Sequence, residues 1–397
     1  MRVLLTSIAH FCDVPGGSQR IVEDESKELQ RRGHDVWVIA PGDPSLSPHE
    51  IRDGVNLLRY AAKNVAAWNP SRRSSHQEAA TQLLRDYLPR VEAIHGHTPL
   101  SYLAACDFYG EEIHACYTIH SPAKLEMAIV WRNSGFLRRV LAPVSLAVIN
   151  RIERQCIQRS RIVSALSQFT IDRVSVIHGG PLARTIRLLP GWVETSVYVP
   201  RDDRTQAKNT LGWSKEYPVF FTLRRLSPRM GLRQLLQASS ILKQQGLKFH
   251  LMIGGNGPLS QELKDQSHAL GLQETVRLLG RIENEQLPLA YAACDAFLLP
   301  TAELECFGLI ALEALASGRP VLATPIGAIP EILTRVEPAW LTQSANPADI
   351  AELMKRYIRN ELPQHSPWDL HRFADREYAR SRLLPAYVDA TVFASHG

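Results

Sequence analysis

The stretch Pro300–Pro330 constrains the fold of this chain most strongly, because it contains a complete loop–helix–strand pattern that a strand leads into. That leading strand is the apolar run Ala296–Leu299. A helix with apolar residues along one side is expected over Gly308–Ser317, and a short strand over Pro320–Thr324. Two strands joined through a helix form the repeating unit of a parallel sheet, so this stretch predicts an α/β fold.

Two glutamates bracket the predicted helix. Glu305 stands at its start and Glu313 follows eight residues later, which corresponds to about 12 Å along a helix that rises about 1.5 Å per residue. The free N–H groups and the positive dipole end of a helix N-terminus suit a phosphate. A nucleotide sugar spans a similar distance from its sugar hydroxyls, across the diphosphate, to its ribose. One carboxylate at each hydroxyl-bearing end, with backbone amides between them, would therefore hold such a ligand.

The segment ECFGLIALE, from Glu305 to Glu313, resembles the E-x7-E motif of retaining glycosyltransferases with the GT-B fold, especially glycosyltransferase family four. The flanking segments PT, ALASGRP and PE are similar to the family's sequence around that motif. The resemblance implies an α/β GT-B fold, in which two Rossmann-like βαβ domains face each other across a cleft. It also implies C-terminal helices that cross back to the first domain.

The strand–helix alternation restarts once, after a linker at Val197–Pro200. We therefore expect an N-terminal Rossmann-like domain on the acceptor side over residues 1–198 and a donor-side domain over 199–376. A C-terminal helix over 377–397 is expected to return to the first domain. The 397 residues, 45% of them hydrophobic, are enough for two separate cores.

The cations expected to bind the diphosphate lie in the segment RLSPRMG, from Arg225 to Gly231. It resembles the family's R-L-x-x-x-K-G segment, whose Arg and Lys neutralise the diphosphate and stabilise it as it leaves. Met230 stands where the family has Lys. Either Arg229 takes over this role, or it rests on Arg225 and backbone amides, and a guanidinium can bind phosphate bidentately.

Glycine-rich loops follow predicted strands in both halves, and glycine lets backbone approach a ligand closely. The loop GGNGP, which contains Gly257, could be read as a dinucleotide fingerprint, but Ser260 replaces its third glycine and a ribose-binding acid is missing. We therefore reject a dehydrogenase and adopt the family interpretation, a turn beside the nucleotide. The donor-binding residues that the resemblance implies are Gly17, Arg225, Arg229, Gly257, Arg281, Ile282, Glu305, Phe307, Gly308, Leu309 and Glu313.

Histidines lie at the ends of two predicted strands of the first half. His120 ends the strand Ala115–His120, where α/β folds place their ligands, and the family has a functional His in this T-x-H context. We predict that His120 contacts the donor sugar and is catalytic together with Arg225 and Glu305.

A metal site is not expected. His95 and His97 could place two imidazoles on one strand face, but two ligands without a nearby third are usually not a metal site. A convincing D-x-D motif is also missing. The predicted reaction therefore needs neither a metal nor another cofactor.

The net charge of +5 comes mostly from Met127–Arg187, which holds ten Arg and two acidic residues. A solvated basic face is one interpretation. The other is contact with an anionic membrane surface or an anionic, lipid-linked acceptor. Nucleic acid is not expected, because no aromatic interleaving accompanies the arginines. Six cysteines without C-x-x-C spacing, an N-terminus that reads as a strand and the lack of a long apolar run favour a cytoplasmic protein, with peripheral contact at the inner membrane face as an option.

The predicted function is retaining, metal-independent transfer of a hexosyl group from a nucleoside-diphosphate sugar to a hydroxyl acceptor, in glycan, polysaccharide or glycoconjugate biosynthesis. The resemblance implies front-face attack, because no protein nucleophile is recognisable. Two alternatives stay open. One is a nucleotide-sugar epimerase or phosphorylase of the same fold, and the other is a catalytically silent sugar-nucleotide-binding subunit, which Met230 favours. The base, the sugar and the acceptor are left open.

Overall fold

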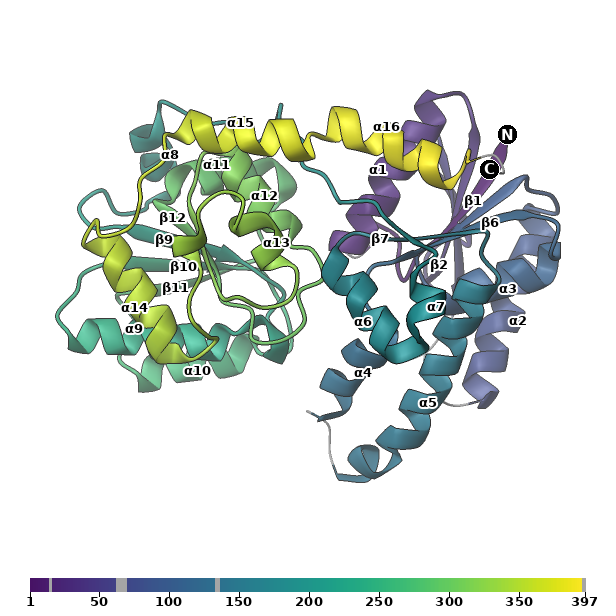
Figure 1. Ribbon diagram of the computed structural model, residues 1–397, viewed down its shortest axis with the longest axis horizontal. Coiled ribbons are helices and arrows are strands. Elements are labelled where there is room, and N and C mark those ends of the chain that lie inside the picture. Colours follow the sequence, from purple (N-terminus) through teal and green to yellow (C-terminus); the bar gives the residue numbers. More distant parts are fainter. Residues whose placement is uncertain (14–15, 62–69, 133–135, 395–397) are drawn as a thin grey trace. The chain divides into compact units, whose positions relative to one another are not determined.

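The computed structural model describes residues 1–13, 16–61, 70–132 and 136–394 (Figure 1). The chain divides into two compact units. The first comprises Met1–Gly191 with Arg382–Gly397, and the second comprises Trp192–Ser381. Each unit is built on a parallel or mostly parallel sheet with helices around it, which confirms the predicted α/β class with two Rossmann-like halves. The predicted boundaries, after residues 198 and 376, differ from these by a few residues.

The described part of the first unit contains an eight-stranded sheet in the order β3-β4-β2-β1-β5-β6-β7-β8. All neighbouring strands are parallel except β3 and β4. The strands are β1 (Arg2–Thr6), β2 (Asp35–Gly42), β3 (His49–Arg52), β4 (Val55–Ala61), β5 (Ala93–Gly96), β6 (His114–Ile119), β7 (Ile162–Ala165) and β8 (Ile186–Leu188). β1 lies in the interior of the sheet. Its residues Val3, Leu4 and Leu5 are wholly buried, as expected for a strand that helices cover on both faces.

The helices of the first unit include one from the end of the chain. They are α1 (Gly17–Arg31), α2 (Pro70–Tyr87), α3 (Pro99–Tyr109), α4 (Ala123–Arg132), α5 (Phe136–Gln158), α6 (Gln168–His178), α7 (Gly180–Ala183) and, from Arg382 onward, α16 (Arg380–Thr391). Arg32 pairs with Asp389 at 2.6 Å, and the His114 ring contacts the Thr391 carbonyl at 2.9 Å, so the end of α1 and the start of β6 both hold α16. No helix among the described residues is both long and apolar enough to cross a bilayer.

The second unit contains a fully parallel five-stranded sheet in the order β11-β10-β9-β12-β13. Its strands are β9 (Val219–Leu223), β10 (His250–Gly254), β11 (Val276–Gly280), β12 (Ala296–Leu299) and β13 (Val321–Ala323). Its helices are α8 (Arg204–Leu211), α9 (Leu232–Gln244), α10 (Ser260–Ala269), α11 (Leu287–Ala293), α12 (Leu309–Ala316), α13 (Ile329–Leu333), α14 (Pro347–Ile358) and α15 (Pro367–Tyr378). In Figure 1, α9, α10 and α14 lie on one side of this sheet and α8, α11 and α12 on the other.

The strand order of the second unit determines where a ligand can bind. From β9 the chain moves outward through β10 to β11, and then returns to place β12 on the other side of β9. The connections that leave β9 and β12 therefore diverge to opposite faces. Open parallel sheets bind their ligands at such a switch point, outside the carboxyl ends of the strands.

Candidate functional site

The switch point of the second unit brings together the two segments that the sequence singled out. Arg224 directly follows β9, and the loop that carries Glu305 follows β12. An Nη2 nitrogen of Arg224 donates to Glu305 Oε2 at 2.8 Å and lies 3.1 Å from Thr301 Oγ1. The Arg224 side chain is 3% exposed and that of Glu305 is 15% exposed, so this ion pair is largely shielded from water.

Arg224 also contacts Met230, the residue that departs from the family pattern. Its Nη2 lies 2.6 Å from Met230 Sδ, so a guanidinium stands beside the side chain that replaces the expected lysine. Arg225, which the sequence favoured for the diphosphate, has an exposed side chain. The sequence interpretation missed Arg224. The doubled arginine after β9 was the available signal, but which of the two turns inward is decided by packing.

Arg229 holds the loop in front of Glu305. Its Nη1 donates to the Leu304 carbonyl at 2.6 Å, and its own carbonyl accepts from the N–H groups of Ala302 at 2.9 Å and Glu303 at 3.1 Å. Leu304 has a φ of 53°, a left-handed conformation that costs a residue with a Cβ about 1–3 kcal/mol and that surrounding contacts must hold in place. In this structure Arg229, a predicted donor-binding residue, contacts the loop that positions Glu305.

The start of α12 is fixed by close backbone packing. The Glu305 carbonyl accepts from the Ala328 N–H at 2.8 Å, which ties the loop to the segment after β13. Gly308 has a φ of 94°, a backbone conformation that favours glycine, and a Cβ there would lie 2.6 Å from Ile329 Cδ1 and displace the end of that side chain. α12 begins at Leu309, and the first N–H groups of a helix have no partner within it.

Glu313 and Phe307 point into the unit. Glu313 is 2% exposed, and the hydroxyl of Tyr291 donates to its Oε2 at 2.8 Å. The buried Phe307 ring packs edge-on against Tyr378, with ring centroids 6.1 Å apart. The two glutamates of the motif therefore differ in environment. Glu305 is paired with an arginine at the sheet edge, and Glu313 is oriented by a buried tyrosine.

The remaining predicted residues of this half lie in loops along the same sheet edge, because all five strands are parallel. Gly257 follows β10, and a Cβ there would approach the Leu226 carbonyl oxygen to 2.5 Å, so the loop runs against the segment after β9. Arg281 and Ile282 follow β11. Arg281 is exposed and lies 3.2 Å from Glu283, and Ile282 is half-buried.

The first unit has its own switch point, between β1 and β5. Gly17 is the first residue of α1 and is exposed, and His120 directly follows β6 and is half-buried. His120 Nε2 lies 2.9 Å from His97 Nδ1. Glu25, on α1, contacts both His95 and His97, so the sequence premise that this pair lacks a third metal-binding group is wrong. The two histidines are neighbours on one predicted strand, whereas Glu25 lies 70 positions before His95 and approaches it only in the folded chain.

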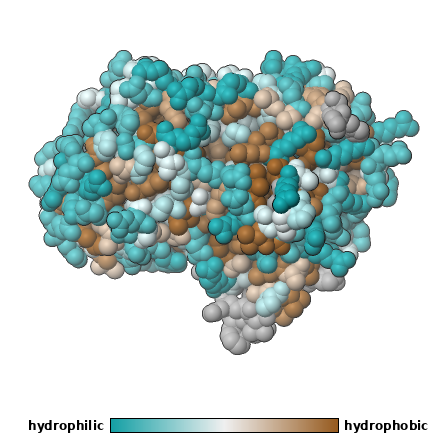
Figure 2. Space-filling view, viewed as in Figure 1, coloured by the Kyte–Doolittle hydropathy of each residue, from teal (hydrophilic) through white to brown (hydrophobic). Residues whose placement is uncertain are grey.

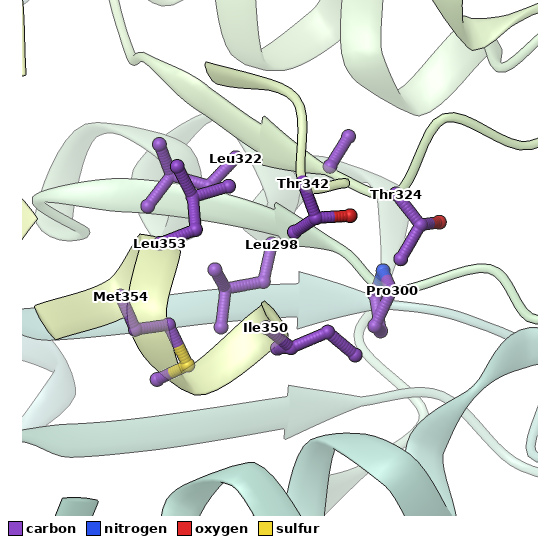
Figure 3. Close-up of a pocket in the computed structure, with 9 residues that line it drawn as sticks. Leu298, Pro300, Leu322, Thr324, Thr342, Ile350, Leu353 and Met354 are labelled. Carbon is purple, nitrogen blue, oxygen red and sulfur yellow. The ribbon is translucent and has the colours of Figure 1, made fainter. Parts of the chain in front are cut away.

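The cavity drawn in Figure 3 is part of the core and not a donor site. It encloses about 10 Å³ behind β12 and β13, which is room for about one water molecule. Leu298, Leu322 and Met354 point into it from the two strands and from α14 (Figure 3). Its apolar lining supports the strands whose carboxyl ends carry the candidate residues.

Comparisons with known proteins agree on one family. Residues 15–197 match the model described as Glycosyltransferase Family 4, and residues 203–374 match the model described as Glycosyl transferases group 1. The chain is 24% identical over 383 residues to N-acetyl-alpha-D-glucosaminyl L-malate synthase of Bacillus anthracis, covering 95% of this chain and 94% of that protein.

Two solved structures share the fold. Sucrose-phosphate synthase from Thermosynechococcus elongatus superimposes with a TM-score of 0.78 at 17% identity, covering 97% of each chain. Anabaena Alr3699/HepE in complex with UDP-glucose superimposes with a TM-score of 0.73 at 17% identity, covering 98% of each chain.

Proposed function

This chain belongs to glycosyltransferase family 4, with the GT-B fold, and we propose that it moves a hexosyl group from a nucleoside-diphosphate sugar to a hydroxyl acceptor with retention of configuration. The observation that carries the proposal is the shielded Arg224–Glu305 pair at the switch point of the second unit. A carboxylate and a guanidinium side by side suit a ligand whose sugar hydroxyls adjoin a diphosphate. HepE, which was solved with UDP-glucose, has the same fold, and this supports a donor of that class.

Each part of the donor has a proposed partner. Glu305 accepts hydrogen bonds from sugar hydroxyls, and Glu313, oriented by Tyr291, accepts them from the ribose. Arg224 and Arg225 bind the diphosphate together with the amides at the start of α12. The backbone at Phe307, Gly308 and Leu309 contributes these amides, and Gly257, Arg281 and Ile282 line the nucleotide. His120 is proposed to contact the transferred sugar.

The proposed reaction exchanges one bond to the anomeric carbon. The bond from that carbon to the phosphate oxygen breaks, and the acceptor oxygen forms its bond on the same face of the sugar. The departing phosphate oxygen takes the acceptor's proton. Negative charge grows on the diphosphate as it leaves, and preorganised N–H donors and guanidinium groups stabilise that charge most in a shielded site. We propose that Arg224 supplies this charge where the family uses lysine, so the reaction is metal-independent.

The acceptor is proposed to be a hydroxyl compound, with a lipid-linked one favoured by the surface of the first unit. Val130, Leu141, Val144 and Val176 are large hydrophobic side chains exposed within Met127–Arg187, the last two by 68% and 80%. Figure 2 shows hydrophobic residues gathered over α5, in the lower part of this unit. Residues 133–135 of this basic segment lie outside the described residues. Hydrophobic side chains among arginines suit an anionic lipid headgroup, and hence peripheral contact with the inner face of a membrane.

One alternative is a catalytically silent sugar-nucleotide-binding subunit. Met230, in place of a phosphate-binding lysine, favours it. The guanidinium of Arg224 beside Met230 favours an active enzyme, because the missing charge has a replacement within the same site. Turnover by the purified chain with a nucleotide sugar separates the two.

Calorimetric titration with uridine, guanosine and adenosine diphosphates tests donor binding. We expect one of the three to bind, and Glu313→Gln to weaken its binding about tenfold or more, since a hydrogen bond to a charged acceptor contributes about 1.5–3 kcal/mol. Glu305→Ala should abolish sugar transfer with a much smaller effect on diphosphate affinity. The matched control is Glu303→Ala, on the same loop, which should change neither. A loss of diphosphate affinity in Glu305→Ala, with unchanged affinity in Glu313→Gln, would show that the two glutamates have been assigned to the wrong ends of the donor.

A further inference from the structure

Four side chains of the first unit form a continuous hydrogen-bonded chain that reaches His120. Glu25 on α1 lies between the two imidazoles of β5, with His95 Nδ1 2.6 Å from Oε1 and His97 Nε2 2.9 Å from Oε2. His97 Nδ1 in turn lies 2.9 Å from His120 Nε2. The side chains of Glu25 and His95 are wholly buried, and that of His97 is 1% exposed. These contacts link α1, β5 and the residue after β6.

The charge of the buried cluster follows from its composition. Burial raises the pKa of the Glu25 carboxyl, but its interactions with His95 and His97, which include a hydrogen bond to each ring, outweigh burial and lower that pKa to about 2. Burial and the charge on His95 lower the pKa of His97 to about 4. For His95, burial works against the charged form, but interactions with Cys116 and Glu25 raise its pKa to about 10. One charged imidazole therefore balances one carboxylate, and His97 is neutral.

The position of each proton follows from this arrangement. An ionised carboxylate can only accept, so both ring nitrogens that face Glu25 must carry hydrogen. Neutral His97 carries one ring proton, on Nε2, and donates it to Glu25. Its Nδ1 therefore has no proton and can only accept, so His120 Nε2 must be the donor to it. We infer that Glu25, acting through His97, holds His120 in the tautomer protonated at Nε2 and leaves His120 Nδ1 as a hydrogen-bond acceptor.

The other end of the chain is closed by hydroxyl groups. His95 Nε2 lies 2.8 Å from Thr118 Oγ1, which also contacts Ser164 Oγ and the Tyr387 hydroxyl, each at 2.6 Å. A hydroxyl donates one hydrogen bond and accepts two, so Thr118 accommodates all three partners when His95 donates to it. Thr118 and Glu25 therefore fix the orientation of the His95 ring, and Glu25 also fixes that of the His97 ring.

The tautomer determines what His120 can bind, a consequence that rests on the proposed function. A bare Nδ1 accepts a hydrogen bond from a hydroxyl and cannot donate one to a phosphate oxygen. His120 would thus recognise a sugar hydroxyl and not the diphosphate. Glu25 and His97 are positioning residues, because they act on the ligand only through His120.

The experiment is nitrogen–proton correlation spectroscopy of the full chain with labelled histidines, with the signals of His120 identified by their loss in His120→Gln. We expect His120 to carry its proton on Nε2 and His95 to be doubly protonated, without change between about pH 6 and about pH 8, where ordinary histidines titrate. Glu25→Gln should convert His95 to a neutral ring and shift the nitrogens of His97 and His120. The matched control is Glu153→Gln, which breaks an equally buried pair with His178 in the same unit and should leave the His120 nitrogens unchanged.

Transfer kinetics supply a second readout. Glu25→Gln should lower kcat by about tenfold or more with unchanged diphosphate affinity, because loss of a carboxylate that fixes an imidazole tautomer impairs the imidazole. A proton on Nδ1 of His120 in the unaltered protein would overturn the inference, whether or not the chain transfers sugar. So would stoichiometric zinc bound by Glu25, His95 and His97, whose ligand atoms lie within 4.8 Å of one another. Zinc would appear as signal shifts reversed by a chelator.

Discussion

Arg224 and Arg225 are neighbours in the chain with opposite environments. Arg224 is buried, with its guanidinium between Glu305 and Met230, and Arg225 is exposed. A buried charge is stable only when it is paired and hydrogen-bonded, and Glu305 and Thr301 meet that requirement for Arg224. In the proposed reaction, Arg224 keeps its ion pair with Glu305 and also stabilises the negative charge of the departing diphosphate.

Moving the positive charge from position 224 to position 230 tests whether Arg224 stabilises the departing diphosphate. Arg224→Met should lower kcat by a factor of about 100–1,000, the usual effect of removing one donor to a developing negative charge. The double variant Arg224→Met with Met230→Lys moves the cation to the position that the family uses and should regain most of the loss. Steady-state transfer kinetics measure both. The role is lost if Arg224→Met transfers sugar at the unaltered rate, or if the added lysine brings no recovery.

The sequence singled out Glu305, Phe307, Gly308 and Glu313 because they belong to one motif with fixed spacing. Arg224 and Glu25 escaped prediction for a common physical reason. The choice between Arg224 and Arg225 depends on which side chain the loop after β9 turns inward, and Glu25 meets His95 only when α1 packs beside β5, 70 positions along the chain. Contacts of this kind leave no local pattern.

At the scale of elements, the loop from Pro300 to Gly308 is held by contacts from outside it. Arg229 bonds it through a side-chain donor and a backbone acceptor, and Leu304 stays in a left-handed conformation. The alternation of strands and helices predicted the strand that enters this loop and the helix that leaves it. It could not predict the strain at Leu304, because a leucine there has no local preference for positive φ.

Arg229→Met distinguishes a loop-positioning role from direct phosphate binding. Without the bond to the Leu304 carbonyl, the loop should open more often, so its amide protons should exchange faster and kcat should fall severalfold. Diphosphate affinity measured by calorimetry should stay the same. A parallel loss of affinity and kcat would restore the sequence interpretation, in which Arg229 binds the phosphate. Arg233→Met, which removes only a surface pair with Glu262, is the control.

At the scale of the whole molecule, the two units differ in their buried histidines. Burial is the first cause of large reductions in the pKa of four histidines of the first unit, to about 4 for three of them and well below the ordinary value for the fourth. They are His10, His76, His97 and His120. A histidine with a lowered folded-state pKa binds its proton more readily in the unfolded chain, so acid favours unfolding.

The stability of the first unit should therefore fall as the pH drops from about 6.5 towards 4, and fall further as Glu25 is protonated. Scanning calorimetry at a series of pH values should show one transition moving to lower temperature. His10→Gln keeps a donor for the Leu58 carbonyl but cannot titrate, so it should flatten the dependence. A transition that does not move with pH in this range would mean that these histidines are charged in the folded protein.

Transfer of a sugar from a nucleotide sugar with retention can be tested with water as the acceptor, without knowledge of the natural acceptor. The purified chain is incubated with α-linked sugars of uridine, guanosine and adenosine diphosphate, and proton NMR follows the first sugar released, before its anomers interconvert. We predict that one donor releases its nucleoside diphosphate together with the α-anomer, and that Arg224→Met and Glu305→Ala suppress this release. Release of the β-anomer first would exclude retention, and release of no nucleoside diphosphate from any donor would exclude the proposed transferase activity.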